Sequence, residues 1–241
     1  MPRISLVVPA YNEAAYLPAL LASVDVARQR YAYRADEVEV IVADNASTDT
    51  TAAVASRSGA RVVRVERRSI AAARNGGARA AAGPILAFVD ADSTIHPATF
   101  DAIERTLGND VIAGVTGVRM SRTSLGIAAS TFVIDSISRL NRLGTGVVFC
   151  RHADWLAVGG YDETRKYGED AHFLLALKRL GRSRGQRIAY ARNVRTISSA
   201  RKFDRHGDWH VFTTAAKSLA WMATDRAKLD RFVERYWYDD R

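Results

Sequence analysis

The chain has 241 residues, of which 48% are hydrophobic and 25% are charged, and its formal net charge at pH 7 is +9. This composition excludes a disordered chain and allows a sizeable hydrophobic core. The positive charge indicates an anionic partner such as a nucleotide, a lipid headgroup or a nucleic acid. The single cysteine, Cys150, excludes an intramolecular disulfide, and its apolar neighbours predict that it is buried.

Strand and helix patterns alternate through the first half of the chain. Short apolar runs predict strands at 4–8, 38–42, 61–65 and 85–89, and helical spacing predicts helices at 14–30, 50–58 and 69–82. Strands that are apolar throughout are buried on both faces, as in a parallel sheet covered by helices. The sequence therefore predicts an α/β fold with a mostly parallel open sheet, which binds ligands at the carboxyl ends of its strands.

The second half is less regular. We expect strands at 110–118, 145–150 and 187–190, helices at 127–143 and 169–180, and a helical tail over 208–235. Residues 198–207, between the last strand and the tail, are expected to form a mobile loop. The tail combines aromatic residues such as Trp209 and Phe212 with basic ones, and it is expected either to pack on the core or to attach to an anionic membrane.

Three predicted strand ends carry acids or turn-forming polar residues, at 9–13, 44–49 and 90–92. In a parallel sheet these ends line one crevice, where an aromatic ring, carboxylates and loop amides can hold a base, a ribose and a metal-bound diphosphate. For the first two segments a structural alternative stays open, because Asn12 and Ser47 are also good helix N-caps.

Asp90 and Asp92 flank a single alanine directly after a buried strand. Like charges this close repel each other unless a cation lies between them. Hard divalent cations such as Mg²⁺ and Mn²⁺ take carboxylate and phosphate oxygens as ligands. The pair therefore predicts a divalent metal at the end of the fourth strand.

Two further segments follow the same order along the chain: 73–77, which reads Ala-Arg-Asn-Gly-Gly, and the acid pair Glu169 and Asp170. With these segments, residues 4 to about 181 resemble a family 2 glycosyltransferase with the GT-A fold, a Rossmann-like open sheet. The resemblance implies an inverting transferase that uses Mn²⁺ or Mg²⁺ and moves a sugar from a nucleotide-sugar donor to a hydroxyl acceptor. The acceptor, whether saccharide, lipid or small molecule, is not identified by the sequence.

The resemblance also implies roles for individual residues. Pro9, Tyr11 and Glu13 would cradle the base and ribose, Asp44 would hydrogen-bond the base, Arg74 and Asn75 would lie near the ribose and diphosphate, Asp90 would face the ribose or a metal-bound water, Asp92 would ligate the metal, and Asp170 would be the catalytic base. From spacing alone, Asp170 also fits an acid that stabilises the start of a helix, and Arg74 a solvated helix residue.

The basic loop and the base pocket complete the hypothesis. Arg201, Lys202 and Arg205 are expected to contact phosphates, Glu169 is the second candidate for the base, and His206 either completes the metal site or is a surface histidine. A UDP-sugar is favoured, because uracil offers a small ring for Tyr11 to cover and an imide N–H for Asp44 to accept. Residues 159–162 resemble the family segment before the acid pair, and the aromatic residue there is expected either to stack on a sugar or to pack in the core.

The expected organisation is a single domain with a nucleotide-sugar-binding half over 1–118, an acceptor and catalytic half over 119–207, and a helical tail over 208–241. We expect a cytoplasmic protein, with peripheral contact at the inner face of the membrane as an alternative, because the chain shows no secretory signal and no apolar run near the ~20 residues of a membrane span.

Two other functions share some of these features. A sugar-1-phosphate nucleotidyltransferase has the same architecture, but it usually shows a glycine-rich loop with an arginine after the first strand, where this chain has Pro-Ala-Tyr-Asn-Glu. A nucleic-acid-binding module would use the basic stretch from Lys178 to Arg205, which contains no recognisable binding motif. We therefore expect no nucleic-acid partner.

Overall fold

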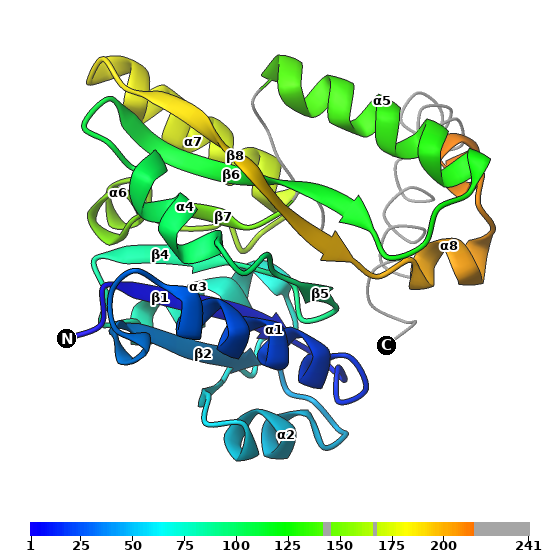
Figure 1. Cartoon of the computed structure of the whole chain (residues 1–241), viewed down its shortest axis with the longest axis horizontal. Coiled ribbons are helices and arrows are strands. Elements are labelled where there is room, and N and C mark those ends of the chain that lie inside the picture. Colours follow the sequence, from blue (N-terminus) through cyan, green and yellow to red (C-terminus); the bar gives the residue numbers. More distant parts are fainter. Residues whose placement is uncertain (142–145, 166–167, 215–241) are drawn as a thin grey trace.

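The computed structural model of the chain describes residues 1–141, 146–165 and 168–214. Within these residues, one sheet of eight strands runs in the order β3-β2-β1-β4-β7-β6-β8-β5 (Figure 1). The strands are β1 Ile4–Ala10, β2 Val38–Asp44, β3 Arg61–Arg64, β4 Ile85–Phe88, β5 Ser93–Thr94, β6 Val111–Met120, β7 Val148–Arg151 and β8 Arg187–Ser198. The helices are α1 Leu17–Arg30, α2 Thr51–Arg57, α3 Ile70–Ala80, α4 Thr99–Thr106, α5 Leu125–Asn141, α6 His152–Ala157, α7 Glu169–Ser183 and α8 Arg201–His206, with a short 3₁₀ helix at Ala35–Glu37.

The strand directions divide the sheet into two parts. Strands β3, β2, β1 and β4 pair in parallel, as the first half of the sequence predicts. Strand β7 is antiparallel to both β4 and β6, β8 is parallel to β6, and the short β5 pairs antiparallel with the end of β8. The prediction of a mostly parallel α/β sheet flanked by helices is confirmed, and its antiparallel pairs all involve strands outside the β3-β2-β1-β4 block.

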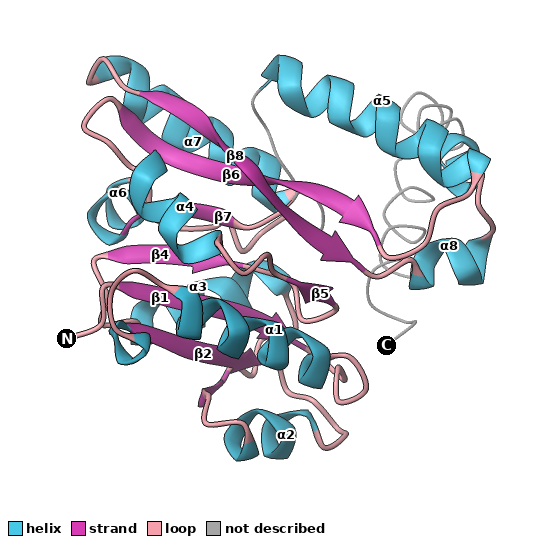
Figure 2. Ribbon diagram, in the orientation of Figure 1, coloured by secondary structure: helices cyan, strands magenta, loops and turns pink. Residues whose placement is uncertain are grey.

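Helices cover both faces of the sheet (Figure 2). On one face, Leu6 and Val8 of β1 pack in a core that includes Leu20 of α1 and Phe100 of α4. On the other face, Val7 packs in a second core that includes residues of α3, α6 and α7. Since successive side chains of a strand point to opposite faces, two buried faces require the uninterrupted apolar run seen in the sequence. Cys150 is buried in the second core, as expected.

Helix α3 approaches the sheet closely. A Cβ atom on Gly77 would lie 2.4 Å from Cγ1 of Val7, and one on Gly76 would lie 2.5 Å from Cγ2 of Val65. Only glycine permits this approach, so close packing against the sheet explains two residues that are otherwise unfavourable inside a helix. The approach fixes Arg74 and Asn75, which directly precede these glycines on α3, relative to β1.

The expectation of a loop over 198–207 is wrong, because α8 forms there. The apolar side chain in this helix, Phe203, packs with Ile127 of α5. On the outer side, Arg122 lies 2.7 Å from both Asp204 and Asp208. These contacts reach residues far along the chain and leave no periodic pattern in the local sequence, which explains the error.

The expected helical tail is described only in part. A helix begins at His210 and continues to Thr214, and residues 215–241 lie outside the described residues. In the part of the chain that the structure describes, no helix is long and apolar enough to cross a membrane.

Candidate active site

The loops after β1 and β2 are tied together by side chains from both. Asn12, with a left-handed backbone φ of 51°, accepts a hydrogen bond from the backbone N–H of Thr48 at 2.9 Å, and its own N–H donates to Ser47 Oγ at 3.1 Å. Neither Asn12 nor Ser47 caps a helix, since α1 follows Tyr16 and α2 follows Thr50. The helix-cap alternative is therefore wrong for both residues. Their contacts instead join the loops that follow β1 and β2.

The residues predicted to hold the base lie at the ends of β1 and β2, where these two loops begin. Pro9 and Asp44 are buried near the ends of the adjacent strands β1 and β2. Asp44 Oδ1 accepts a hydrogen bond from the backbone N–H of Ser47 at 3.2 Å. The guanidinium of Arg68 lies 3.7 Å from the centre of the Tyr11 ring, an arrangement that the sequence did not indicate. The structure brings these predicted residues together, and their contact with a nucleotide stays a prediction.

A buried arginine joins segments that are distant in the sequence. Arg74 of α3, whose side chain is 4% exposed, donates to Asp90 Oδ1 at 2.9 Å and to Glu169 Oε1 at 2.8 Å. The Nη1 atom of Arg74, which donates to Glu169, also lies 3.0 Å from Asp170 Oδ1. The alternative that Arg74 is a solvated helix residue is therefore wrong. Three predicted site acids, one after β4 and two at the start of α7, meet around this guanidinium.

This cluster changes the protonation of Asp170. Burial raises the pKa of Asp170 to about 6, and Glu169 and Asp90 act in the same direction, while Arg74 and the Tyr161 hydroxyl act against them. An aspartate with this pKa is ionised at neutral pH and accepts a proton more readily than an ordinary carboxylate. Its side chain is 31% exposed, so a second molecule can reach it. Asp170 also lies in the first turn of α7, so the helix-stabilising role stays open.

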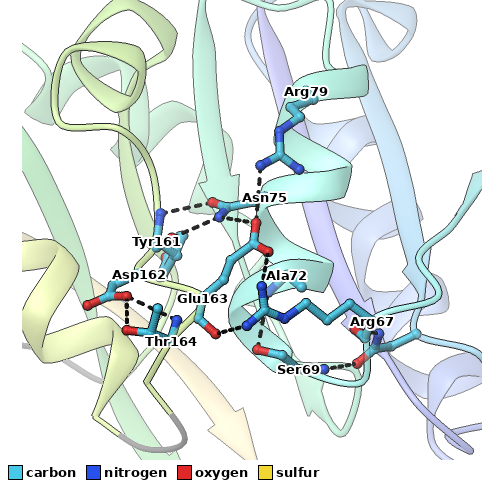
Figure 3. Close-up of polar contacts among 10 residues, drawn as sticks. Arg67, Ser69, Ala72, Asn75, Arg79, Tyr161, Asp162, Glu163 and Thr164 are labelled. Carbon is cyan, nitrogen blue, oxygen red and sulfur yellow. Dashed lines mark hydrogen bonds and ion pairs between the residues drawn. The ribbon is translucent and has the colours of Figure 1, made fainter.

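Asn75, next to Arg74 on α3, is engaged by the protein itself (Figure 3). Its Oδ1 accepts from the backbone N–H of Tyr161 at 2.8 Å, and its Nδ2 donates to the Tyr161 carbonyl at 2.8 Å and to Glu163 Oε1 at 2.9 Å. Asn75 is buried, and its predicted place near the ribose and diphosphate stays a prediction. Tyr161 is buried and stacks on Phe173 with ring centres 4.1 Å apart, so of the two roles expected for it, core packing is the one seen.

A second arginine, on α8, pairs with two other predicted site acids. Arg201 of α8 donates two hydrogen bonds to the buried carboxylate of Glu13, at 2.9 and 2.7 Å. Its Nη2 also lies 3.0 Å from Asp92 Oδ2, and its guanidinium lies 4.8 Å from the centre of the Tyr16 ring. The side chain is 21% exposed. The predicted phosphate-binding arginine therefore contacts two other predicted site residues, one of them the proposed metal ligand.

The remaining residues of the predicted metal and phosphate site lie on α8. His206 ends this helix, with its ring centre 5.8 Å from that of His210, while Lys202 is half-buried and Arg205 exposed. Across the described ranges, no group of three or more His, Cys, Asp or Glu side chains is arranged to hold a metal. Asp92 and His206 stay predicted ligands.

The basic stretch from Lys178 to Arg205 is divided among α7, β8 and α8. Several of its arginines pair with acids: Arg184 lies 2.7 Å from Asp154, and Arg187 lies 2.9 Å from Asp110. Arg187 and Arg195 also line an open groove of about 1230 Å³ between α4 and strands β6 and β8. These basic residues are therefore spread over three elements, and the expectation of no nucleic-acid partner stays a prediction.

The family model described as glycosyl transferase family 2 matches residues 5–150. An uncharacterized glycosyltransferase of Mycobacterium tuberculosis is 37% identical over 113 residues, which are 46% of this chain and 47% of that protein. The match thus spans about half the length of that curated relative.

Solved structures share the fold. The mannosyltransferase PcManGT from Pyrobaculum calidifontis, in complex with GDP-Man and Mn²⁺, aligns with a TM-score of 0.65 and 19% identity over 96% of this chain and 78% of its own. TarS from S. aureus, in complex with UDP-GlcNAc, aligns with a TM-score of 0.64 and 20% identity over 83% of this chain and 58% of its own. These likenesses agree with the GT-A fold that the sequence implied.

Proposed function

The chain belongs to glycosyl transferase family 2, and we propose that it transfers a sugar from a nucleoside-diphosphate sugar to a hydroxyl acceptor with inversion at the anomeric carbon. The observation that carries the proposal is the cluster around Arg74, which joins Asp90 at the end of β4 to Asp170 at the start of α7. It brings an acid with a raised pKa to the edge of the sheet where open α/β folds bind ligands.

In the proposed reaction, Asp170 acts as the general base. The acceptor oxygen forms a bond to the anomeric carbon as the bond from that carbon to the diphosphate oxygen breaks. Attack from the face opposite the diphosphate inverts the configuration, and the acceptor proton passes to Asp170. Arg74 keeps Asp170 ionised at neutral pH by opposing the effect of burial on its pKa. General-base catalysis of this kind typically contributes about 10²–10⁴-fold to the rate.

A divalent ion, Mn²⁺ or Mg²⁺, is proposed as the cofactor, with Asp92 and His206 as its ligands. Arg201 already places a positive charge 3.0 Å from Asp92, which supports the view that this position accommodates a cation. When bound, such an ion neutralises charge on the departing diphosphate. Arg201, Lys202 and Arg205 would add positive charge on the same side.

A UDP-sugar is the proposed donor. Solved proteins with this fold bind either base, since TarS holds UDP-GlcNAc and PcManGT holds GDP-Man. In this chain Tyr11 and Asp44 lie at adjacent strand ends, which suits a small base with an imide N–H for the carboxylate to accept. Pro9 and Glu13 would complete the base and ribose pocket. The acceptor hydroxyl is not assigned to a compound.

Peripheral membrane contact is kept as part of the proposal. The side chains of Trp209 and Phe212 are exposed shortly after α8, the helix that carries Arg201, Lys202 and Arg205. Exposed aromatic rings beside basic residues are typical of surfaces that attach to anionic membranes. Binding to vesicles that contain anionic lipid, and loss of that binding in Trp209→Ser, would support this contact.

Calorimetric titration with UDP tests the donor and metal sites. We expect UDP to bind in the presence of Mn²⁺, and we expect Asp92→Ala to abolish the Mn²⁺ dependence while the melting temperature changes little. Asp36→Asn, which removes an exposed acid paired with Arg34, is the matched control and should bind as the wild type does. Unchanged Mn²⁺-dependent affinity in Asp92→Ala would contradict the metal assignment. Tighter binding of GDP than UDP would contradict the assignment of the base.

A further inference from the structure

Glu163 lies at the centre of a polar network that neither the motifs nor the family resemblance assigned (Figure 3). Its Oε1 accepts from Asn75 Nδ2 at 2.9 Å and from Arg79 Nη2 at 3.1 Å. Its Oε2 lies 3.4 Å from Arg67 Nη1, and its backbone carbonyl accepts from Arg67 Nη2 at 2.9 Å. The hydrogen bond from Asn75, together with the two arginines, lowers the pKa of Glu163, so it is a carboxylate at neutral pH.

This carboxylate fixes the orientation of the Asn75 amide. Because Glu163 can only accept, Nδ2 must face it, and Oδ1 then faces the backbone N–H of Tyr161. The fit is tight: a Cβ on Gly160 would lie 2.6 Å from Asn75 Oδ1, and Gly160 has a φ of +72°. The backbone of Gly160 and Tyr161 is therefore held in one position against α3.

Tyr161, which is held in this way, lies next to Arg74, around which the acids meet. Its ring stacks on Phe173 of α7 and meets Phe88 of β4 edge-on, with centres 5.1 Å apart. The Arg74 guanidinium lies 5.2 Å from the centre of the same ring. The Tyr161 hydroxyl also acts to lower the pKa of Asp170. The position of this ring relative to Arg74 thus depends on the hydrogen bonds between Asn75 and the backbone of Tyr161.

We propose that Glu163 is a positioning residue for the acid cluster: through Asn75 it holds Tyr161 at the depth that sets Arg74 and Asp170 in their places. This inference rests on the proposed function of Asp170. It adds a residue that lies outside the set of site residues predicted from the sequence.

The test compares Glu163→Ala with Glu163→Gln. Glutamine keeps an oxygen that accepts from Asn75 and loses only the charge toward Arg67 and Arg79, whereas alanine removes both. We expect turnover of UDP-glucose or UDP-GlcNAc by hydrolysis in the presence of Mn²⁺ to fall at least about tenfold in Glu163→Ala and less than about threefold in Glu163→Gln. The KM for the donor should change less than turnover in both variants, because Glu163 makes no predicted donor contact of its own and acts through Asn75.

Amide hydrogen exchange gives a readout that is independent of the reaction. In Glu163→Ala we expect faster exchange both at 159–165 and in the first turns of α7, with α1 unchanged. Asp36→Asn is again the control and should alter neither. If Glu163→Ala does not fold, Glu163→Asp, which shortens the side chain by one methylene, takes its place with the same expectations.

Two results would overturn the proposal: turnover in Glu163→Ala within twofold of the wild type, or faster exchange confined to 162–165 with α7 unaffected. A wild-type chain that binds no UDP and hydrolyses no UDP-sugar would instead contradict the proposed function. In that case the exchange data alone decide whether Glu163 controls the position of the segment that carries Asp170.

Discussion

Two arginines, Arg74 and Arg201, pair with the acids of the candidate site, and they do so in different ways. Arg74 comes from α3, in the parallel half of the sheet, and its side chain is 4% exposed. Arg201 comes from α8, a helix of six residues near the end of the described chain, and its side chain is 21% exposed. The first is buried on α3, and the second is partly exposed on α8. We therefore expect Arg74 to serve as framework and Arg201 to serve as a replaceable contact.

The charges around the two arginines sharpen the difference. Arg74 faces Asp90, Glu169 and Asp170, so its single positive charge leaves the cluster negative. Burial alone lowers the pKa of Arg74, but these acids raise it well above its ordinary value, and the guanidinium stays charged. Arg201 faces Glu13 and Asp92, both predicted to contact the donor or its metal. We therefore expect a metal ion at Asp92 to compete with Arg201 directly and with Arg74 only through Asp90.

The largest effect is expected from Arg74→Met, which keeps the length of the side chain and removes its charge. Three carboxylates would then lack a counter-charge, with Asp90 49%, Glu169 13% and Asp170 31% exposed. Leaving a buried charge unpaired typically costs about 3–5 kcal/mol of unfolding free energy, and the water that reaches Asp90 and Asp170 should keep the loss near the lower end of that range. Urea unfolding followed by circular dichroism measures the change. Arg201→Met is the comparison variant and should cost somewhat less, because the Arg201 side chain is 21% exposed against 4% for Arg74, although the change leaves the carboxylate of Glu13 buried without its partner. Equal losses in the two variants would remove the distinction drawn between them.

The next effect concerns catalysis at the Arg74 cluster. Asp170→Asn keeps the shape of the side chain and removes the basic oxygen, so turnover should fall by about 10²–10⁴-fold while affinity for UDP and Mn²⁺ stays within about twofold. Kinetics and calorimetry on one preparation measure both. If turnover is retained and the melting temperature falls, Asp170 only stabilises the start of α7, a role worth at most ~1 kcal/mol, and Glu169 becomes the candidate base.

The raised pKa of Asp170 gives the same variant a pH signature. Ionised Asp170 is the active form, so wild-type turnover should decline tenfold per pH unit below about 6, and the residual turnover of Asp170→Asn should not. Stability runs the opposite way. The pKa is raised from 3.8 in the unfolded chain to about 6 in the folded one, so the folded state binds this proton more tightly. That stabilisation is complete below pH 3.8 and is lost as the pH rises through about 6. Asp170→Asn should therefore be relatively more stable at pH 7 than at pH 4, compared with the wild type.

The sequence predicted the parts of this arrangement that depend on local pattern. The strands before Asp44 and Asp90 are apolar on both faces, so their ends and the polar residues after them were placed correctly. The order of the motifs identified the family before any contact was known. Arg74 was harder, because an arginine in an alanine-rich helix looks solvated, and its partners Glu169 and Asp170 lie far along the chain.

The second half was predicted less well for the same physical reason. Helix α8 is held by Phe203 and by ion pairs to Arg122, and neither leaves a periodic signal in a short polar segment. Glu163 follows a turn at Asp162 and has no motif of its own. Its importance appears only when α3 and residues 159–165 are brought together by the fold. A sequence shows which residues alternate, whereas a buried polar network depends on which distant residues meet.

The smallest effect is expected at the replaceable contact, in Arg201→Gln. Removing the guanidinium leaves Glu13 and Asp92 without the positive charge that now neutralises them, so Mn²⁺ should bind about tenfold more tightly in the absence of nucleotide. UDP should then lose part of this advantage, because the diphosphate loses one cation that we propose contacts it. Calorimetric titration with Mn²⁺ alone, and with UDP at saturating Mn²⁺, measures the two steps separately. Arg34→Gln, which breaks an exposed ion pair with Asp36, serves as the control.

The two titrations distinguish a contact that the metal displaces from one that stays in place. If Arg201 remains on Asp92 while the metal binds, removing it should weaken rather than strengthen the binding of Mn²⁺, because the acids would lose the group that orders them. If it is displaced, the free guanidinium can turn to the diphosphate, and the loss should appear only in the step with UDP. Tighter Mn²⁺ with weaker UDP would therefore identify Arg201 as a group that exchanges carboxylates for phosphates as the donor binds. Unchanged binding in both titrations would show that Arg201 takes part in neither step and would contradict its proposed contact with the diphosphate.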